Sequence, residues 1–184
     1  MTSSKNYKQV LAHFNGKSQD IIRYFPEFKK LVVGYSWDVS VSYVFSRIET
    51  AKHMAIYCGI VKLHWADSAL TKGLVDKDHM SRSRFRELFK TVYGNSMDAV
   101  LLDKLSSAEA IRDKVVHGKI WADKQARSAL IDILDFAEGL NELTYKIAGF
   151  NILGDLRGFK GRKESLSRDT TRWVLRGMGI PAKE

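Results

Sequence analysis

The chain has 184 residues, 45% of them hydrophobic and 28% charged, and its 30 Lys and Arg against 21 Asp and Glu give a formal net charge of +9. This length and composition favour one domain with peripheral pieces. No apolar run approaches the roughly 20 residues that a membrane-spanning helix needs, and no apolar signal region follows the first residues. We therefore expect a soluble, cytoplasmic protein without membrane association. The excess of basic charge makes nucleic acid the leading class of partner.

The first segment predicts short elements. Residues 5–14 and 18–25 have the pattern of two short helices, and Pro26 ends the second. Leu31-Val32-Val33 could form a brief strand. Residues 1–37 are thus expected to be an N-terminal helical extension that precedes the main domain.

The longest helical pattern covers about residues 38–66, with a stripe of residues spaced by three or four: Val44, Ile48, Ala51, Ala55, Cys58 and Lys62. This spacing predicts a member of a helical bundle. The single cysteine of the chain, Cys58, lies on the apolar part of the stripe and cannot form an internal disulfide, so we expect it to be buried.

Further helices are expected along the rest of the chain. Residues 81–93 predict a helix with one apolar and one basic side, residues 97–105 a short helix, and residues 123–148 a long helix with a bundle seam. Residues 151–184 combine a basic, glycine-containing connector with a short helix at 165–177. The fold class is therefore all-α: an antiparallel bundle over 38–150, preceded by short helices and followed by a basic extension.

One segment between these helices carries residue types that suggest chemistry. Ser106 with Glu109 reads as a capping box, with Ser107 as an alternative cap, and Gly118 as a left-handed stop, which predicts a helix over about 107–117. His117 would then lie at the carboxyl end of this helix.

Within this helix, Asp113 lies one turn before His117 and could hold its ring. Arg112 lies about 140° round the helix from His117, so the two side chains do not converge within one chain. A second copy of the chain could complete the site.

The segment resembles the Arg-x4–6-His motif of the HEPN superfamily, matched by Arg112, the polar Asp113 and His117. The resemblance covers about residues 38–150 and implies a helical bundle of the HEPN type that pairs as a homodimer with the motif at the interface. It also implies a metal-independent endoribonuclease without cofactors, and the roles open to such an enzyme include that of a toxin or defence effector with a neutralising protein partner. Arg47 and His53 match the same string but lie in the middle of a long helical pattern, without a cap or glycine nearby.

The implied reaction is RNA cleavage by attack of the 2′-hydroxyl. His117 would act as base or acid, because an imidazole changes its charge near neutral pH. Arg112 would hold the phosphate and stabilise the charge that develops on it, and Asp113 would orient His117 or bind the ribose. Family members that pair with a nucleotidyltransferase often carry a Tyr two residues after the motif His. Lys119 occupies that position here, which puts such regulation in doubt.

A second candidate region is the basic C-terminal segment, where Phe159 and Trp173 lie among Arg and Lys residues. Aromatic side chains in such a setting can stack on unpaired bases. Trp173 could instead join Val174 and Leu175 in the apolar face of a docking helix, which we favour because large aromatic residues are usually buried. The residues expected to bind RNA are Lys119, Arg157, Lys160, Arg162, Lys163 and Arg172.

Other site classes find little support in the sequence. Glu49, His53, Tyr57 and His64 share one side of the long helix, but no His-Glu-x-x-His motif is present, so we expect a polar face and no metal site. No nucleophile elbow or phosphate-binding loop occurs. The alternatives to a nuclease are a non-catalytic helical protein that binds nucleic acid through its basic tail and a partner-binding module that dimerises through residues 123–148.

Overall fold

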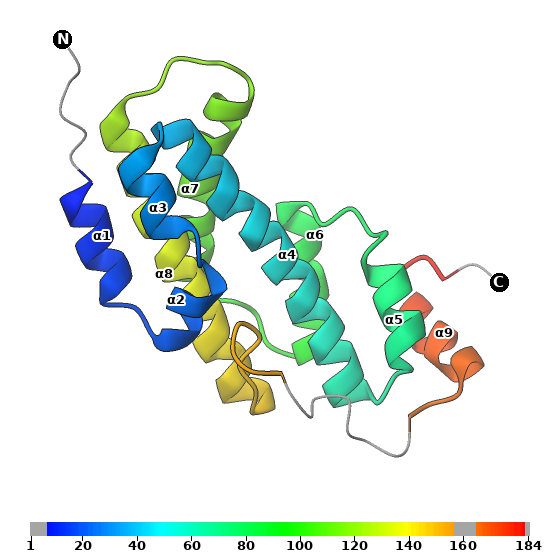
Figure 1. Ribbon diagram of the computed structural model, residues 1–184. Helices are drawn as coiled ribbons and strands as arrows, with labels where there is room; N and C mark the ends of the chain where they lie inside the picture. Colours follow the sequence, from blue (N-terminus) through cyan, green and yellow to red (C-terminus); the bar gives the residue numbers. More distant parts are fainter. Residues whose placement is uncertain (1–6, 157–164, 183–184) are drawn as a thin grey trace, which may run out of the picture. The chain divides into compact units, whose positions relative to one another are not determined.

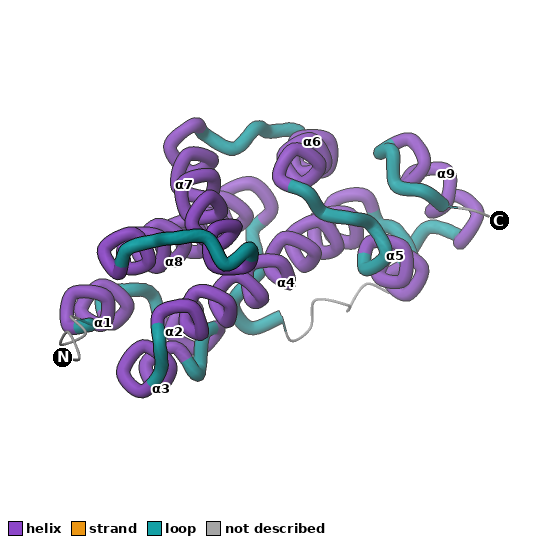
Figure 2. Tube along the Cα trace, turned by 90° about the horizontal axis from the view of Figure 1, so that it is seen from above, coloured by secondary structure: helices purple, strands orange, loops and turns teal. Residues whose placement is uncertain are grey.

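The computed structural model describes residues 7–156 and 165–182, and every regular element in these ranges is a helix (Figure 1; Figure 2). The helices are α1 (Lys8–Asn15), α2 (Gln19–Tyr24), α3 (Phe28–Gly34), α4 (Trp37–His64), α5 (Ser68–Val75), α6 (Arg82–Tyr93), α7 (Ala99–Val116), α8 (Asp123–Ala148) and α9 (Arg168–Gly177). The predicted all-α class is therefore confirmed, while a bundle of the HEPN type stays a prediction. Among the described residues, no helix has both the length and the apolar character needed to cross a bilayer.

The long helices lie where the periodicity placed them, and the short elements differ. The pattern over 38–66 corresponds to α4, and the one over 123–148 corresponds to α8. The strand predicted at Leu31-Val32-Val33 is wrong, because this segment belongs to α3. Phe28 and Val32, one helical turn apart, are both fully buried while Lys30 between them is exposed, which fits a helix, because a strand would place all three on one face. Helix α5 was not predicted.

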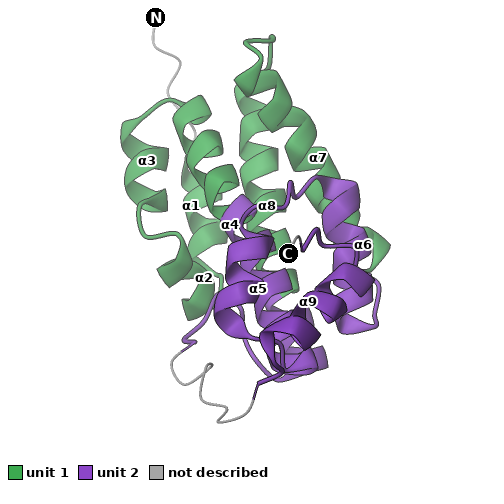
Figure 3. Cartoon of the chain, turned by 90° about the vertical axis from the view of Figure 1, so that its right-hand side faces the viewer, with its two compact units in different colours: residues 1–48, 98–140 green, residues 49–97, 141–184 purple. Residues whose placement is uncertain are grey.

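The chain divides into two compact units, drawn in different colours in Figure 3. The first comprises Met1–Ile48 and Asp98–Leu140, and the second comprises Glu49–Met97 and Asn141–Glu184. Two of the three boundaries therefore fall inside α4 and α8, and the third falls between α6 and α7. The expected division into segments 1–37, 38–150 and 151–184 is based on sequence pattern, whereas these units are defined by contacts. The expected division therefore stays a prediction.

The first unit has an aromatic core at its amino-terminal end. The rings of Phe14 and Phe28 lie 4.4 Å apart, and Phe25 packs edge-on against Tyr43 at 6.5 Å. Helices α7 and α8 approach closely, because a Cβ atom at Gly139 would lie 2.7 Å from Cδ1 of Leu101. A side chain at position 139 would therefore have to displace the end of the Leu101 side chain.

The second unit is held by packing of α4 on α6 and by bonds to helix ends. A Cβ atom at Gly59 would lie 2.5 Å from Cγ1 of Val92, so only glycine allows this approach. The ring of Tyr93 stacks on Phe89 at 4.3 Å, and its hydroxyl donates to the carbonyl of Ala55 at 2.7 Å. The second unit is thus fixed by both shape and hydrogen bonds.

Helix α9 docks on the region around α5 through a small buried face. Thr171 and Leu175 are fully buried, and the hydroxyl oxygen of Thr171 accepts the backbone N–H of Asp67 at 2.9 Å. Just before α9, the N–H of Leu166 donates to the carbonyl of Trp65 at 2.8 Å. These contacts fix which side of α9 faces outward.

Candidate functional site

Helix α7 carries the Arg-His segment and begins earlier than its sequence predicts. Its N-cap is Asp98, whose side chain accepts the N–H of Leu101 at 2.7 Å, so the predicted capping box at Ser106 is wrong. Ser106 lies in the interior of a continuous helix, since the two helices predicted over 97–105 and 107–117 are one. The buried side chains of Leu101, Leu105 and Ala108 form one face that runs through the expected break near residue 106, which favours a single continuous helix.

The carboxyl end of α7 agrees with its prediction. Gly118 has φ of 61°, and its N–H donates to the carbonyl of Val115, while the N–H of Lys119 donates to the carbonyl of Lys114 at 2.9 Å. This pair of bonds is a Schellman motif, which requires a residue in the left-handed conformation directly after the C-cap. Gly118 therefore ends the helix so that His117 occupies the C-cap position.

The three motif residues are all accessible to solvent at this helix end. The Nη1 atom of Arg112 donates to Oδ1 of Asp113 at 3.0 Å, and the side chains of these two residues are 42% and 53% exposed. His117 is exposed. Its backbone N–H donates to the carbonyl of Asp113 at 3.0 Å, and within the described part of the chain its ring makes no hydrogen bond.

The expected contact between Asp113 and the His117 ring is absent from this arrangement, because the carboxylate of Asp113 pairs with Arg112. His117 is the C-cap residue, with φ of −92° and ψ of 12°. The result is a paired arginine and a separate, accessible imidazole.

Apolar side chains surround His117 at the same helix end. Val116 is 58% exposed and Ile120 is 97% exposed, and Lys119 between them is also exposed. Isolated exposed apolar residues are common, but two of them beside a charged and polar motif form a small mixed surface. This surface has the composition of an interface as well as of a binding site.

Two other histidines of the described ranges, His53 and His64, have structural roles. The ring of His64 donates from Nε2 to the carbonyl of Val92 at 2.7 Å, and the ring of His53 donates from Nδ1 to the carbonyl of Val75 at 3.1 Å. These carbonyls are at the carboxyl ends of α6 and α5, where helices leave acceptors unpaired. Histidine side chains on the expected polar side of α4 thus donate hydrogen bonds to carbonyl groups at the ends of two other helices.

The second match to the motif string is also structural. Arg47 donates from Nη2 to the carbonyl of Tyr24 at 2.8 Å and lies over its ring at 4.1 Å, while His53 is bound to Val75. Burial raises the pKa of the Tyr24 hydroxyl to about 12. Because both motif side chains at this position are engaged in packing, the Arg112 and His117 segment is the better candidate.

The residues expected to bind RNA are only partly described. Lys119 is exposed at the end of α7, and Arg172 lies on α9. Arg157, Lys160, Arg162 and Lys163 lie outside the described residues. The two described members belong to different units, so they are considered separately.

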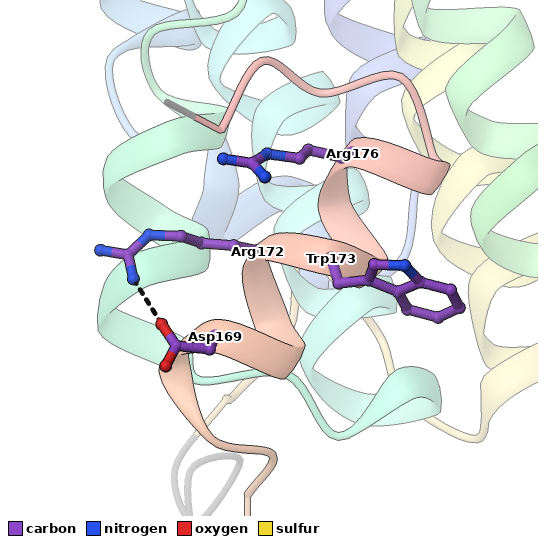
Figure 4. A pocket seen from close by; sticks show the side chains of 4 residues that line it. All are labelled: Asp169, Arg172, Trp173 and Arg176. Atoms are coloured by element: carbon purple, nitrogen blue, oxygen red, sulfur yellow. Dashed lines mark hydrogen bonds and ion pairs between the residues drawn. The ribbon is translucent and has the colours of Figure 1, made fainter. Parts of the chain in front are cut away.

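The outward side of α9 forms an open hollow of 510 Å³ lined by Asp169, Arg172, Trp173 and Arg176, which we call the α9 hollow (Figure 4). Arg172 donates from Nη1 to Oδ1 of Asp169 at 2.9 Å, and Arg176 donates from Nε to the carbonyl of Ala182 at 2.7 Å. Trp173 is 75% exposed, so the favoured interpretation of this residue as part of an apolar docking face is wrong. Thr171 and Leu175 form the buried face, and Trp173 lies two residues from each and points away.

A cluster of charges that the sequence did not reveal lies in the first unit. Asp135 on α8 accepts bonds of 2.6 Å each from His13, Lys17 and Lys104, and Lys17 also donates to Glu138 at 2.7 Å. We call these five residues the Asp135 cluster. They come from α1, the α1–α2 turn, α7 and α8, so no local motif marks them.

The cluster shifts the ionisation of its members. Burial alone would raise the pKa of Asp135, but the hydrogen bonds from Lys104, Lys17 and His13 outweigh burial and hold this pKa well below its usual value. Burial would likewise lower the pKa of Lys17, whereas its bonds to Asp135 and Glu138 raise it. The charges within the cluster are therefore mutually paired, which identifies it as a structural clamp.

Residues 7–156 and 165–182 contain neither a metal-binding group of side chains nor a reactive cysteine. No group of three or more His, Cys, Asp or Glu side chains there is arranged to hold a metal ion. Cys58 is buried, as expected, and burial raises the pKa of its thiol to about 12. A thiol with so high a pKa is a poor nucleophile at neutral pH.

Comparison of the chain with protein-family models, with curated proteins and with solved structures gives no match.

Proposed function

We propose that the protein is a metal-independent endoribonuclease of the HEPN type whose active site forms at the carboxyl end of α7. The observation that carries this proposal is the placement of Arg112, Asp113 and His117. All three are accessible at one helix end, and the imidazole of His117 has no bond within the described part of the chain. His53 and Arg47, the other candidates for such roles, are held in structural contacts.

The chemistry requires a proton-transfer group and a phosphate-binding cation. The imidazole of His117 takes the proton of the 2′-hydroxyl or supplies one to the leaving 5′-oxygen. The guanidinium of Arg112 binds the phosphate in place of Asp113, because two oxygens of a phosphate can accept two of its N–H groups. Asp113 keeps Arg112 oriented before RNA arrives.

A second copy of the chain completes the site in this proposal. Arg112 and His117 project about 140° apart on α7, so a two-fold axis at this helix end would bring Arg112 of one protomer to His117 of its partner. The exposed side chains of Val116 and Ile120 would be covered by the same contact. Pairing thus accounts for both the divergence of the motif and the apolar residues beside it.

The test is RNA cleavage in excess EDTA by purified wild-type protein, His117→Ala and the control His79→Ala. His79 is an exposed histidine outside the motif. We expect the wild type and His79→Ala to produce 2′,3′-cyclic phosphate and 5′-hydroxyl ends, with a loss of about 100- to 10,000-fold in His117→Ala. Equal cleavage by His117→Ala, cleavage of DNA or a strict need for Mg²⁺ contradicts the proposal.

A second candidate function is binding of nucleic acid without cleavage. The observation that favours it is the α9 hollow, in which two arginines and an exposed indole occur together. In that case the wild type and His117→Ala bind RNA with equal affinity, and neither protein cleaves it. Cleavage by the wild type alone supports the nuclease, whereas binding without cleavage supports this second function.

A further inference from the structure

We propose that the α9 hollow binds single-stranded RNA, with a nucleobase stacked on Trp173 and neighbouring phosphates paired with Arg172 and Arg176. This inference rests on the proposed function in one respect: it supplies a hold on the RNA that the nuclease cuts. Binding at the hollow does not itself require cleavage, so it is measured separately.

The fold presents Trp173 to solvent by fixing the opposite side of its helix. Thr171 and Leu175 are fully buried, and the bond from Asp67 to Thr171 sets the rotation of α9. Trp173 is therefore held outward, with 75% of its surface exposed. An indole ring offers a large flat face on which any base can stack.

The two guanidinium groups are positioned beside this ring. Arg172 and Arg176 are one helical turn apart, which separates them by about 6 Å along the axis. Figure 4 shows both extending to the same side, with Trp173 on the other flank of the exposed face. Asp169 holds Arg172 and the carbonyl of Ala182 holds Arg176, so less side-chain freedom is lost when an anion binds.

Both arginines keep donors for a ligand. Arg176 uses Nε for the Ala182 carbonyl, and its Nη groups make no hydrogen bond with described residues. Arg172 uses Nη1 for Asp169, and its Nη2 group makes no hydrogen bond with described residues. Two arginines against the single carboxylate of Asp169 leave the hollow with net positive charge.

Charge and ring chemistry together select the occupant. An acidic peptide would pair with the arginines but would leave the indole without a matching flat ring. A duplex would offer phosphates but keeps its bases stacked inside. Single-stranded RNA supplies both phosphates and accessible bases, and it is the ligand that uses every side chain of the hollow.

The experiment is fluorescence anisotropy with a fluorescein-labelled 12-nucleotide oligouridylate in EDTA, using the full chain with His117→Ala so that the probe stays intact. We expect Trp173→Ala to raise Kd about 5- to 100-fold and Trp173→Phe to retain most of the affinity. Arg172→Gln and Arg176→Gln should each raise Kd and lower the slope of log affinity against log salt by about one.

Matched controls remove the same groups elsewhere. Tyr145→Ala deletes another exposed aromatic side chain, 60% exposed, and Arg23→Gln removes another exposed arginine charge. Neither should change Kd more than about twofold, since neither lies in the hollow. Circular dichroism and urea unfolding of each variant establish that α9 remains folded.

Three results would overturn the proposal. The first is unchanged RNA affinity in Trp173→Ala. The second is an equal loss, in Trp173→Ala, of affinity for single-stranded RNA and for heparin, a polyanion without bases. The third is a change from dimer to monomer in Trp173→Ala without a change in RNA affinity, which would make the hollow an interface between copies.

The outcomes for the two proposals remain distinguishable. If Trp173→Ala loses RNA binding and the wild type does not cleave RNA, the nuclease proposal is contradicted and the proposal of RNA binding at the α9 hollow is supported. If cleavage depends on His117 but RNA affinity is unchanged in Trp173→Ala, the nuclease proposal is supported and the proposal of RNA binding at the α9 hollow is contradicted.

Discussion

Asp135 is the residue on which most of the paired charge in the first unit converges. The ammonium groups of Lys17 and Lys104 and the imidazole of His13 bind its two oxygens at 2.6 Å, although only 21% of its side chain is exposed. Each contact joins α8 to another segment of the first unit. A carboxylate with this many donors stabilises the fold chiefly because its removal leaves several partly buried cations unpaired.

We predict that Asp135→Asn lowers the free energy of unfolding by about 1–3 kcal/mol at pH 7. The amide keeps the size of the side chain but loses the charge. The matched control is Asp103→Asn, the same change at an exposed position on α7, which should alter stability by less than about 0.5 kcal/mol. Urea unfolding followed by circular dichroism measures both, and equal effects of the two substitutions would contradict the clamp.

The same variant has a defined pH dependence. Because the pKa of Asp135 is depressed in the folded state, its contribution is present above the unfolded value near 3.8 and is lost as pH falls toward the folded value. The difference in stability between wild type and Asp135→Asn should therefore be larger at pH 7 than at pH 3. An unchanged difference at the two pH values would show that the carboxylate charge does not stabilise the fold.

At the scale of elements, α7 shows how a distant cap fixes the position of the motif. Asp98 begins the helix, and Gly118 ends it twenty positions later in the chain. The buried side chains of Leu101, Leu105 and Ala108 hold the helix in the first unit, and the Schellman motif sets the C-cap position of His117. The motif is therefore placed by the whole helix and not by its last turns alone.

We predict that Asp98→Ala lowers the free energy of unfolding by about 1 kcal/mol, because the first turn of α7 loses its side-chain acceptor. The control is Ser107→Ala, at an exposed position that the sequence suggested as a cap and the structure places mid-helix. Alanine is favourable inside a helix, so this change should be neutral or slightly stabilising. Thermal unfolding of both proteins decides between the two starting points of the helix.

At the scale of the whole molecule, assembly is the property on which the proposed active site depends. The carboxyl end of α7 leaves Val116 and Ile120 exposed beside the motif, and the motif residues diverge within one chain. In the proposed function, a second copy of the chain would cover these apolar residues and supply the group that one chain lacks.

We predict that Ile120→Glu weakens self-association at least tenfold and reduces RNA cleavage with it, because a charge replaces an apolar side chain that is 97% exposed in the single chain. Val100→Glu makes the same kind of change at the other end of α7, where Val100 is 66% exposed, and should leave association unchanged. Sedimentation velocity over a range of concentrations measures both. If the dimer persists in Ile120→Glu, its interface does not include the carboxyl end of α7, and the prediction is wrong.

The sequence by itself determined the long helices, the buried cysteine and the end of the motif helix. Hydrophobic period alone places α4 and α8, because a helix that buries one face must repeat apolar residues every three or four positions. Gly118 is equally local, since the left-handed conformation that ends α7 favours glycine.

Tertiary structure decided the features that depend on contacts between distant segments. Leu31-Val32-Val33 has strand propensity, yet the segment is helical in the fold, where Phe28 and Val32 are buried and Lys30 is exposed. The Asp135 cluster joins residues more than a hundred positions apart, which no spacing rule encodes. Likewise, the residues that α9 buries determine the exposure of Trp173, because an aromatic side chain in an amphipathic helix can belong to either face until the helix has docked.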